Sequence, residues 1–496
     1  MTGIRRALAW TALDRYLHLP IGIVQVALMS RLLTPHEVGI SAIGYSFLAL
    51  AETLRDFGAT TYLIQKREIS TTTLRTTFTL LLLTTLIMVG AIFASAPFIA
   101  QAYGEPGLQG YIWVLATSFA LGPFAAPILS LMRRDMQFNK LAAINLTISS
   151  LGAFVSILLA YLGFSYMSIA WAGVSMAVCG TALAFWIRPS FYIYRLELHD
   201  WRDVFYFGSF ATLTAFLTKG YQAVPLFLLG RVVSIESAGL FQRATAICDL
   251  PERFVSAIIA QVALPAFSAA ARAGADLKEA YLKSIEHITA IYWPALSMLV
   301  ALAYPLVRIL LGPQWTAVAP LVQILAVASL SLFAAVLTYP VLVAVGRIND
   351  TLYSSLVSLP LSLLILVPSA FLGIETLTLS FLLTLPLQMF VALVFIRRHI
   401  PFSWLELVAA TRKGAMVTII SMIGPALVIV FNGAGFDMHL LNAVLAALLG
   451  LMGWFLGLWL SGHPLLAQLG ELVQFVTSTL SARGFLRNRA DPSEKP

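Results

Sequence analysis

Residues 77–100 read TFTLLLLTTLIMVGAIFASAPFIA, and this stretch of the 496-residue chain contains no charged side chain. A helix rises about 1.5 Å per residue, so a run of this length spans the roughly 30 Å hydrocarbon core of a bilayer. Similar runs rich in Leu, Ala, Ile and Val recur along the chain. Because transmembrane β-strands have short segments of alternating hydrophobicity, these continuous runs predict an all-α integral membrane protein.

The composition agrees with this class. Hydrophobic residues make up 59% of the chain, charged residues 11%, and the mean hydropathy is +0.87. A soluble protein has roughly a quarter of its residues charged, so most of this surface must face lipid. Cys179 and Cys248 form no CxxC pattern, and the sequence therefore suggests neither a metal site nor a disulfide framework.

The hydrophobic segments number about fourteen, and their boundaries are approximate. The first follows Arg5 and Arg6 as in a signal peptide, but it extends to Leu33 without a small-residue cleavage site, so we expect it to be retained. The predicted transmembrane helices are residues 7–33, 38–63, 77–100, 111–132, 143–163, 167–187, 204–230, 238–264, 288–311, 318–344, 352–372, 375–396, 414–432 and 440–461.

Lysine and arginine residues gather in alternate connections between these helices. The opposite connections carry only Arg31, Arg231 and Arg308. Positive residues favour the cytoplasmic side, which predicts a multi-pass protein of the cell inner membrane with both termini in the cytoplasm. The cytoplasmic set comprises Arg5, Arg6, Lys66, Arg67, Arg75, Arg133, Arg134, Lys140, Arg188, Arg195, Arg202, Arg272, Lys278, Lys283, Arg347, Arg397, Arg398, Arg412, Lys413, Arg483, Arg487, Arg489 and Lys495.

An internal duplication is visible at an offset of 200 residues. SRLLTPHEVGI at 30–40 aligns with GRVVSIESAGL at 230–240, so that Gly39 matches Gly239, and Glu52 then matches Glu252. An even number of helices per half predicts a parallel repeat about an axis along the membrane normal. We therefore expect two six-helix bundles at 1–187 and 204–396, an amphipathic linker at 188–203, two additional helices at 414–461 and a cytoplasmic tail at 462–496. The linker and the tail segment 464–486 are predicted to form helices on the inner leaflet.

Charged residues inside the predicted spans lie only on the first two helices of each half. A charge at the bilayer centre costs at least about 2.5–3.5 kcal/mol, so each must face a partner or a watery cavity. Glu52–Arg55 and Asp249–Arg253 have the spacing of intrahelical ion pairs, whereas Lys219 has no acid within reach on its own helix. The set comprises Asp14, Arg15, Glu52, Arg55, Asp56, Lys219, Arg243, Asp249, Glu252 and Arg253.

The depth of the positive residues suggests a cationic ladder. Arg15 and Arg55 lie toward the cytoplasmic third, Lys219 near the middle and Arg243 toward the outer third. Facing one cavity, they would bind an anion, since guanidinium groups form strong paired bonds with phosphate.

No motif in the chain points to catalysis, a metal or another cofactor. It contains no GxxxxGK[ST] loop, no HExxH and no Ser/His/Asp cluster. Nucleic acid is not expected as a partner either, because the net charge of +8 follows from the cytoplasmic connections. Transport would draw on an ion gradient or on consumption of the product. Asp14, Glu52 and Asp249 are the candidates for ion coupling.

The segment SRLLTPHEVGISAIGYSFLALAETLRDFGATTYLIQ at 30–65, its echo GRVVSIESAGLFQRA at 230–244 and ALPAFS at 263–268 resemble Wzx-type flippases. These are polysaccharide transporters of the multidrug/oligosaccharidyl-lipid/polysaccharide exporter superfamily. The resemblance covers the whole chain. It implies two six-helix bundles that flip an undecaprenyl-diphosphate-linked oligosaccharide to the outer leaflet through a cationic cavity, for exopolysaccharide or lipopolysaccharide synthesis.

The resemblance also implies which residues bind the substrate and which partners the protein has. Membrane lipids, a polysaccharide polymerase and the chain-length machinery would be the partners. Many members carry an acid in the middle of the seventh helix, where this chain has Lys219, and this difference leaves the coupling ion open. The positions that match the cavity are Arg15, Arg55, Lys219, Arg243 and Arg253.

Three alternatives remain. A multidrug exporter of the same superfamily would favour acidic cavity residues for cationic drugs, whereas this chain has a surplus of Arg and Lys. An exporter of a peptidoglycan precursor is harder to separate from a polysaccharide flippase. A membrane glycosyltransferase or polymerase would need a large outer loop, and every predicted outer connection is short.

The predicted topology can be tested with reporter fusions. A reporter fused after Gly104 should be active only outside the cytoplasm, and one fused after Lys278 only inside, because these positions lie on opposite sides of the predicted membrane. Alkaline phosphatase and green fluorescent protein activities measure the two locations. The same compartment for both fusions would contradict the orientation.

Overall fold

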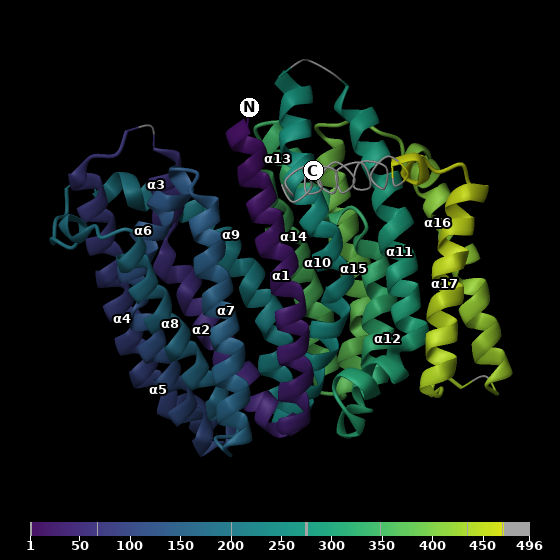
Figure 1. The fold of residues 1–496 in the computed structure, drawn as a ribbon, viewed down its shortest axis with the longest axis horizontal. Helices are drawn as coiled ribbons and strands as arrows, with labels where there is room; N and C mark the ends of the chain where they lie inside the picture. The colour runs from purple at the N-terminus through teal and green to yellow at the C-terminus, as the bar shows by residue number, and fades with distance from the viewer. Residues whose placement is uncertain are drawn as a thin grey trace, which may run out of the picture.

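The computed structural model describes residues 2–66, 68–199, 201–272, 276–347, 349–433, 435–468 and 470. This part of the chain is built of helices and contains no strand. Figure 1 shows two bundles of long helices side by side, with a further pair of helices at one edge. We call the helix ends on the side of the N-terminus inner and the opposite ends outer, following the orientation predicted from the positive residues.

The first bundle consists of α1 to α8. The end of α2 and the start of α3 are separated by Phe57 and Gly58, both with positive φ. The fourth span is bent by 44° between α5 and α6. The helices are α1 (Thr2–Leu32), α2 (Pro35–Asp56), α3 (Ala59–Gln65), α4 (Thr71–Tyr103), α5 (Pro106–Ala120), α6 (Gly122–Arg134), α7 (Phe138–Tyr161) and α8 (Met167–Ile187).

The second bundle begins at α9, which ends in a π-helical turn, η2. Its fourth span is also interrupted, by the 3₁₀ turn η4. The elements are α9 (Trp201–Leu228), η2 (Leu229–Val233), α10 (Ile235–Arg272), α11 (Leu277–Leu310), η3 (Pro313–Trp315), α12 (Val318–Ser329), η4 (Leu330–Leu332), α13 (Ala335–Ala344), α14 (Asn349–Ala370) and α15 (Ile374–Arg397). The additional pair, α16 (Trp404–Phe431) and α17 (Leu440–Leu460), packs mainly on α11.

Each of the fourteen predicted segments falls on one helix or on consecutive helices. Among the described residues, nine helices are long and apolar enough to cross a membrane, or ten if the bent pair of α5 and α6 forms one span. The charges predicted inside the membrane lie on α1, α2, α9 and α10. The all-α membrane fold is confirmed, and the count of fourteen spans stays a prediction.

The predicted amphipathic helix in the linker is wrong. Residues 188–199 form only the short 3₁₀ turn η1 (Phe191–Ile193), and the chain is held by contacts with the first bundle instead. Tyr194 donates a hydrogen bond to the carbonyl oxygen of Phe124 at 2.6 Å, and Thr76 donates one to that of His199 at 2.8 Å. Ile193 is completely buried. The larger apolar side chains around it, Phe191, Leu196 and Leu198, remain exposed, so the apolar pattern did not require a helix. Most of the predicted tail helix, from 471 onward, lies outside the described residues.

The two bundles meet at the outer ends of α2 and α10, where the duplicated glycines face each other. A Cβ atom on Gly39 would overlap the carbonyl oxygen of Ile235, and one on Gly239 would overlap that of Pro35 and lie 2.9 Å from the backbone nitrogen of Gly39. The two helix backbones can approach this closely only because both positions lack a side chain, as in other small-residue membrane contacts. The sequence repeat therefore marks the seam between the bundles.

We expect Gly39→Ala to open this outer seam. The new methyl group meets a backbone oxygen that cannot turn away, and overpacking of this kind costs about 1–3 kcal/mol, or roughly a tenfold or greater shift in equilibrium. The measurement is the labelling rate of Leu33→Cys, a position 1% exposed at the outer end, by a membrane-impermeant maleimide in a chain without its two native cysteines.

Gly22→Ala on α1 is the matched control, because a Cβ atom there meets no other atom within 4 Å. Labelling should rise about tenfold in the Gly39 variant and remain unchanged in the control. Equal labelling in both would show that the glycine contact does not hold the seam closed.

Candidate functional site

The charged residues of α1, α2, α9 and α10 lie in one layer of the structure. The depth of each residue can be measured along its helix from the outer end of that helix. The outer ends are Leu32 for Asp14, Pro35 for Glu52 and Ile235 for Asp249. For Lys219 the outer end is Val233, the last residue of η2. At about 1.5 Å per residue, all four lie roughly 21–27 Å from the outer ends, in the inner half of a bilayer.

Lys219 is exposed, together with Thr218 and Gln222 on the same side of α9. Among the described residues it makes no hydrogen bond or ion pair. Its neighbour Tyr221 is only 8% exposed, and its hydroxyl accepts a hydrogen bond from Gln388 on α15 at 2.7 Å. α9 therefore buries one face against the second bundle and presents a polar face. At membrane depth, an exposed ammonium group requires water or an anionic ligand.

The charges of α10 also remain accessible. Arg253 and Asp249 form an ion pair at 3.7 Å with side chains 59% and 54% exposed, which is the predicted intrahelical pair. Glu252 beside them is exposed as well. A weak, solvated pair of this kind leaves the guanidinium able to exchange its carboxylate for another anion.

A row of polar contacts joins α1 to α7. Asn145 donates a hydrogen bond to Asp14 at 3.1 Å, and His18 shares one with Ser149 at 2.6 Å. The imidazole of His18 also lies 3.3 Å from the carboxylate of Asp14. Asp14 is thus engaged with the wall of the first bundle. Arg15 follows it on α1, and its side chain lies outside the described part of the structure.

Arg55 is directed away from Lys219, into the break between α5 and α6. Its guanidinium donates a hydrogen bond to the carbonyl oxygen of Phe119 at 3.2 Å and lies 4.5 Å from the centre of the Phe119 ring. It also contacts Gly122, and the carboxylates of Glu52 and Asp56 interact with it electrostatically. A broken helix inside a membrane leaves carbonyl groups unpaired, and Arg55 satisfies one of them. Trp293 does the same at the break in the second bundle, where its Nε1 donates to the carbonyl oxygen of Leu330 at 2.8 Å.

Arg243 is likewise separate from the polar layer. It is 8% exposed and lies with its guanidinium 5.6 Å from the centre of the Trp315 ring. The structure therefore does not place the five predicted binding residues around one point. Lys219 and Arg253 are accessible in the inner half, whereas Arg55 and Arg243 are packed within the protein.

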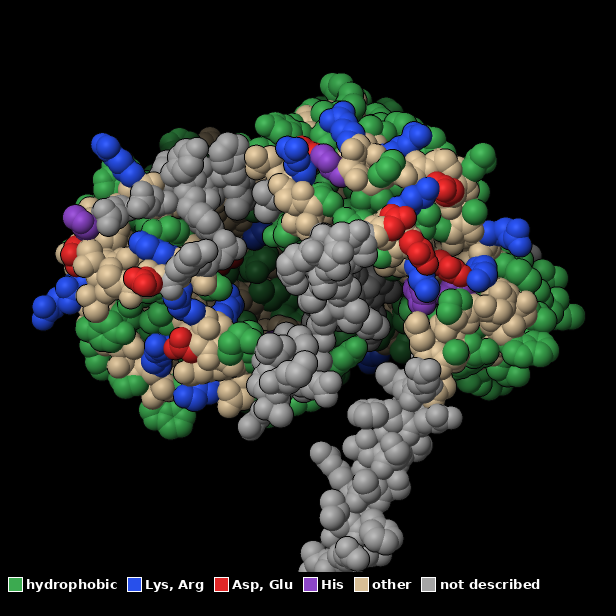
Figure 2. All heavy atoms as spheres, turned by 90° about the horizontal axis from the view of Figure 1, so that it is seen from above, with side chains coloured by type: hydrophobic (Ala, Val, Ile, Leu, Met, Phe, Trp, Pro, Cys, Tyr) green, Lys and Arg blue, Asp and Glu red, His purple; other side chains and the backbone are tan. Residues whose placement is uncertain are grey.

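The outer ends of the bundles are locked together by hydrogen bonds to the end of α1. Gln314 and Trp315 each donate to the carbonyl oxygen of Ser30 at 2.6 Å, and Arg31 donates to that of Ile309 at 2.8 Å. We call these contacts the outer latch. The inner face is different, because Figure 2 shows it hollowed between the two bundles, with charged side chains gathered around it. The outer ends are thus joined by direct contacts, whereas the inner face is hollowed between the bundles.

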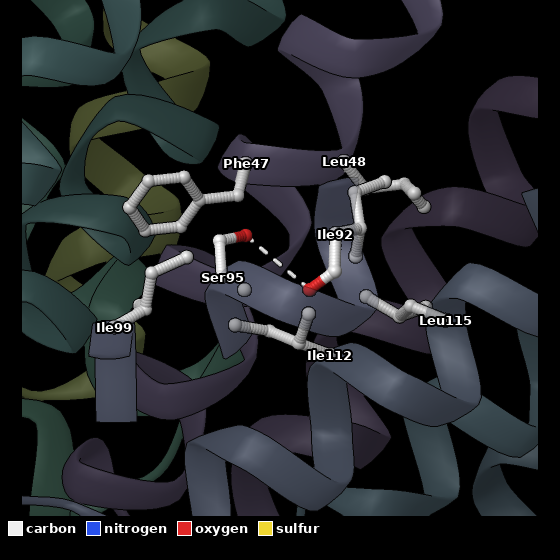
Figure 3. Close-up of a pocket in the computed structure, with 8 residues that line it drawn as sticks. Phe47, Leu48, Ile92, Ser95, Ile99, Ile112 and Leu115 are labelled. Atoms are coloured by element: carbon white, nitrogen blue, oxygen red, sulfur yellow. Dashed lines mark hydrogen bonds between the residues drawn. The ribbon is translucent and has the colours of Figure 1, made fainter. Parts of the chain in front are cut away.

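A small apolar cavity of about 70 Å³ lies within the first bundle, between α2, α4 and α5 (Figure 3). Phe47, Ile92, Ile112 and Leu115 contribute to its lining. The one hydroxyl in it, on Ser95, bonds to the carbonyl oxygen of Ile92 on its own helix. It offers no group for a charged ligand, and the polar layer is therefore the better candidate site.

Comparison with known families identifies the chain. Residues 28–320 match the model of a family described as polysaccharide biosynthesis protein, a stretch that runs from the end of α1 to the start of α12. This chain belongs to that family. The resemblance to Wzx-type polysaccharide transporters of the multidrug/oligosaccharidyl-lipid/polysaccharide exporter superfamily is confirmed.

Several members of the family are similar to this chain. The lipopolysaccharide biosynthesis protein WzxC of Escherichia coli (strain K12) is 24% identical over 331 residues, 65% of this chain and 66% of the relative. The teichuronic acid biosynthesis protein TuaB of Bacillus subtilis (strain 168) is 23% identical over 363 residues, which are 69% of this chain and 72% of the relative. The succinoglycan biosynthesis transport protein ExoT of Rhizobium meliloti (strain 1021) is 24% identical over 327 residues, 65% of each. The chain thus spans about two thirds of the length of these relatives.

Solved structures share the fold. The lipid II flippase MurJ in an inward closed conformation superposes with a TM-score of 0.71 at 10% identity, covering 90% of this chain and 97% of that one. An inward-facing multidrug resistance MATE family transporter of the MOP superfamily gives a TM-score of 0.62 at 15% identity, covering 81% and 99%. This family member therefore has the fold of these transporters.

Sequence reasoning missed the outer latch and the contacts between α1 and α7. Ser30, Gln314 and Trp315 are distant in the chain, and no local pattern brings them together. The α1–α7 contacts had a readable signal: residues 14, 18 and 25 pair with 145, 149 and 156, so both helices carry polar residues at the same spacing.

We expect Arg55→Met to destabilise this protein without a change in its fold. Loss of a hydrogen bond from a charged group costs about 1.5–3 kcal/mol, and the carbonyl group of Phe119 is left unpaired in the membrane. The apparent melting temperature in detergent should fall by several degrees. Lys219→Met is the matched control and should melt like the wild type, because Lys219 makes no such contact. Identical melting of all three proteins would exclude a structural role for Arg55.

Proposed function

We propose that this protein flips an undecaprenyl-diphosphate-linked oligosaccharide from the cytoplasmic to the outer leaflet by alternating access. The observations that support the proposal are Lys219, exposed and without a hydrogen bond or ion pair among the described residues, the hollow between the bundles at the inner face (Figure 2), and the latch at the outer ends. An ammonium group in the inner half of the membrane provides a site for a phosphate that enters from the cytoplasm.

The proposed binding groups are those that a ligand can reach from the inner side. Lys219 and Arg253 contact the diphosphate, and Arg15 of α1 is the third proposed group. The hydrocarbon tail remains in the lipid while the diphosphate and the sugars pass between the bundles. Arg55 acts on this site indirectly, because it holds the bent wall formed by α5 and α6.

The bundles then rock against each other, and the glycine contact of α2 and α10 separates together with the outer latch. Separation of the outer latch opens the passage to the outer leaflet, and the inner ends close. Asp14, Glu52 and Asp249 are the proposed coupling groups. Of these, Asp14 is hydrogen-bonded to α7 and Asp249 is paired with Arg253, so a change of protonation at either would alter a contact that the structure contains.

We place the protein in the cell inner membrane with both termini in the cytoplasm. The family name of polysaccharide biosynthesis protein suits a role in exopolysaccharide or lipopolysaccharide synthesis. A polymerase and chain-length machinery would receive the flipped oligosaccharide at the outer leaflet.

An enzyme of the membrane is the alternative from another class, and the described outer connections disfavour it. Helices α1 and α2 are joined by two residues, α4 and α5 by two, and α14 and α15 by three. Even the longest connection, between α16 and α17, has only eight residues. None has room for a domain that would hold catalytic groups and a sugar donor. Export of a peptidoglycan precursor is the nearest alternative within the superfamily, since it requires the same diphosphate site.

We predict that Lys219→Ala abolishes polysaccharide export while the protein reaches the membrane in normal amounts. Surface polysaccharide and membrane abundance are the two measurements, and the lipid-linked oligosaccharide should accumulate on the cytoplasmic leaflet. Lys219→Arg should retain most of the export because it keeps the charge. Lys140→Ala, which removes an exposed lysine at the start of α7, is the matched control. Full export by Lys219→Ala would refute the assigned role.

A further inference from the structure

Arg243 presents a charge that the closed structure does not neutralise. The side chain is 8% exposed, and its Nε atom has no hydrogen-bond partner. Among the described residues no carboxylate forms an ion pair with it, and its guanidinium lies 5.6 Å from the centre of the Trp315 ring. A buried cation normally has a hydrogen-bonded anion beside it, because the loss of hydration is otherwise uncompensated. An attraction to one aromatic ring at this distance compensates only a small part of that loss.

A second orphaned polar group lies on the other side of the same tryptophan. The hydroxyl oxygen of Ser30 is buried and has no hydrogen-bond partner, although its carbonyl oxygen accepts bonds from Trp315 and Gln314. Ser30 belongs to the first bundle, and Arg243 and Trp315 belong to the second. The indole of Trp315 thus contacts both orphaned residues at the boundary between the bundles.

The position of Arg243 differs from that of the inner binding layer. Measured from Ile235 at the outer end of α10, Arg243 lies about 12 Å deep, whereas Asp249 on the same helix lies about 21 Å deep. When the outer ends separate, Trp315 must leave Ser30, and the guanidinium of Arg243 then borders the widening passage. A planar guanidinium with free N–H groups is suited to a phosphate or diphosphate.

We propose that Arg243 is an outer anion subsite, covered by Trp315 in the closed state, which takes the diphosphate of the ligand when the outer latch opens. The unpaired charge makes the closed seam less stable than it would be with an apolar residue. A diphosphate in the passage neutralises this charge only in the open state, and binding therefore favours opening. This inference rests on the proposed function and adds a second site to it.

The first test compares ligand affinity in the closed and opened proteins. The probe is radiolabelled geranylgeranyl diphosphate, and the opened protein is the Gly39→Ala variant. Arg243→Met should weaken probe binding at least tenfold in the opened protein and less than twofold in the wild type. Arg243→Lys in the opened protein should show an intermediate loss, because it keeps the charge without the planar fork. Arg308→Met removes an exposed outer arginine that pairs with Asp437 and should change neither affinity.

The second test needs no opened variant. Arg243→Met should raise the melting temperature of the wild-type protein and lower the labelling rate of Leu33→Cys, because an apolar residue replaces the unpaired charge at the closed seam. An unchanged or higher labelling rate would overturn the proposal, as would equal probe affinity with and without Arg243 in the opened protein. An equal loss of probe affinity in the wild type and in the opened protein would also overturn the proposal, since Trp315 should cover the subsite in the wild type.

Failure of the proposed function gives a different result. In that case the wild type does not bind the probe, or Lys219→Ala binds it as tightly as the wild type does. If Lys219→Ala weakens binding and Arg243→Met has no effect in either background, the inner site stands and only the outer subsite is refuted.

Discussion

A charged side chain inside a bilayer must meet water, an opposite charge or a polar group of the protein, and the architecture of this molecule follows from that requirement. The charged positions of the membrane interior are confined to α1, α2, α9 and α10. Each of these charges therefore needs a polar partner or water within the protein. The same requirement explains why the remaining helices are so uniformly apolar.

The charges satisfy the requirement in three different ways. Arg55 pairs with a carbonyl group at the bend of α5 and α6, so its charge stabilises the wall. Arg253 pairs with Asp249 on its own helix and remains exposed. Lys219 is exposed and has neither kind of partner among the described residues. Positive residues that look alike in the sequence therefore contribute differently to stability and to the proposed binding of an anion.

The two ends of the passage are built on different physical principles. The outer end is closed by direct backbone contact at Gly39 and Gly239 and by hydrogen bonds from Trp315 and Gln314 to one carbonyl oxygen. These contacts need a defined geometry and little area, and a small rotation of the bundles would break them together. The inner end is hollowed between the bundles, with charged side chains on the surrounding face (Figure 2). Such an arrangement suits a transporter that alternates between two states, because only a few contacts between the bundles must break and form when the state changes.

The sequence by itself determined the helical membrane class and the approximate extent of the helices. Each of these depends on local composition or on spacing along one helix, which the solvent properties of the bilayer translate directly into structure. The sequence could not determine which residues of other helices a side chain contacts. The amphipathic pattern at 188–199 does not form a helix, because contacts such as that of Tyr194 with Phe124 hold the chain in another conformation, and Arg55 and Arg243 are packed within the protein. Contacts such as Ser30 with Trp315, or Gly39 with Ile235, join residues far apart in the chain, and only the docking of the two bundles brings them within reach of each other.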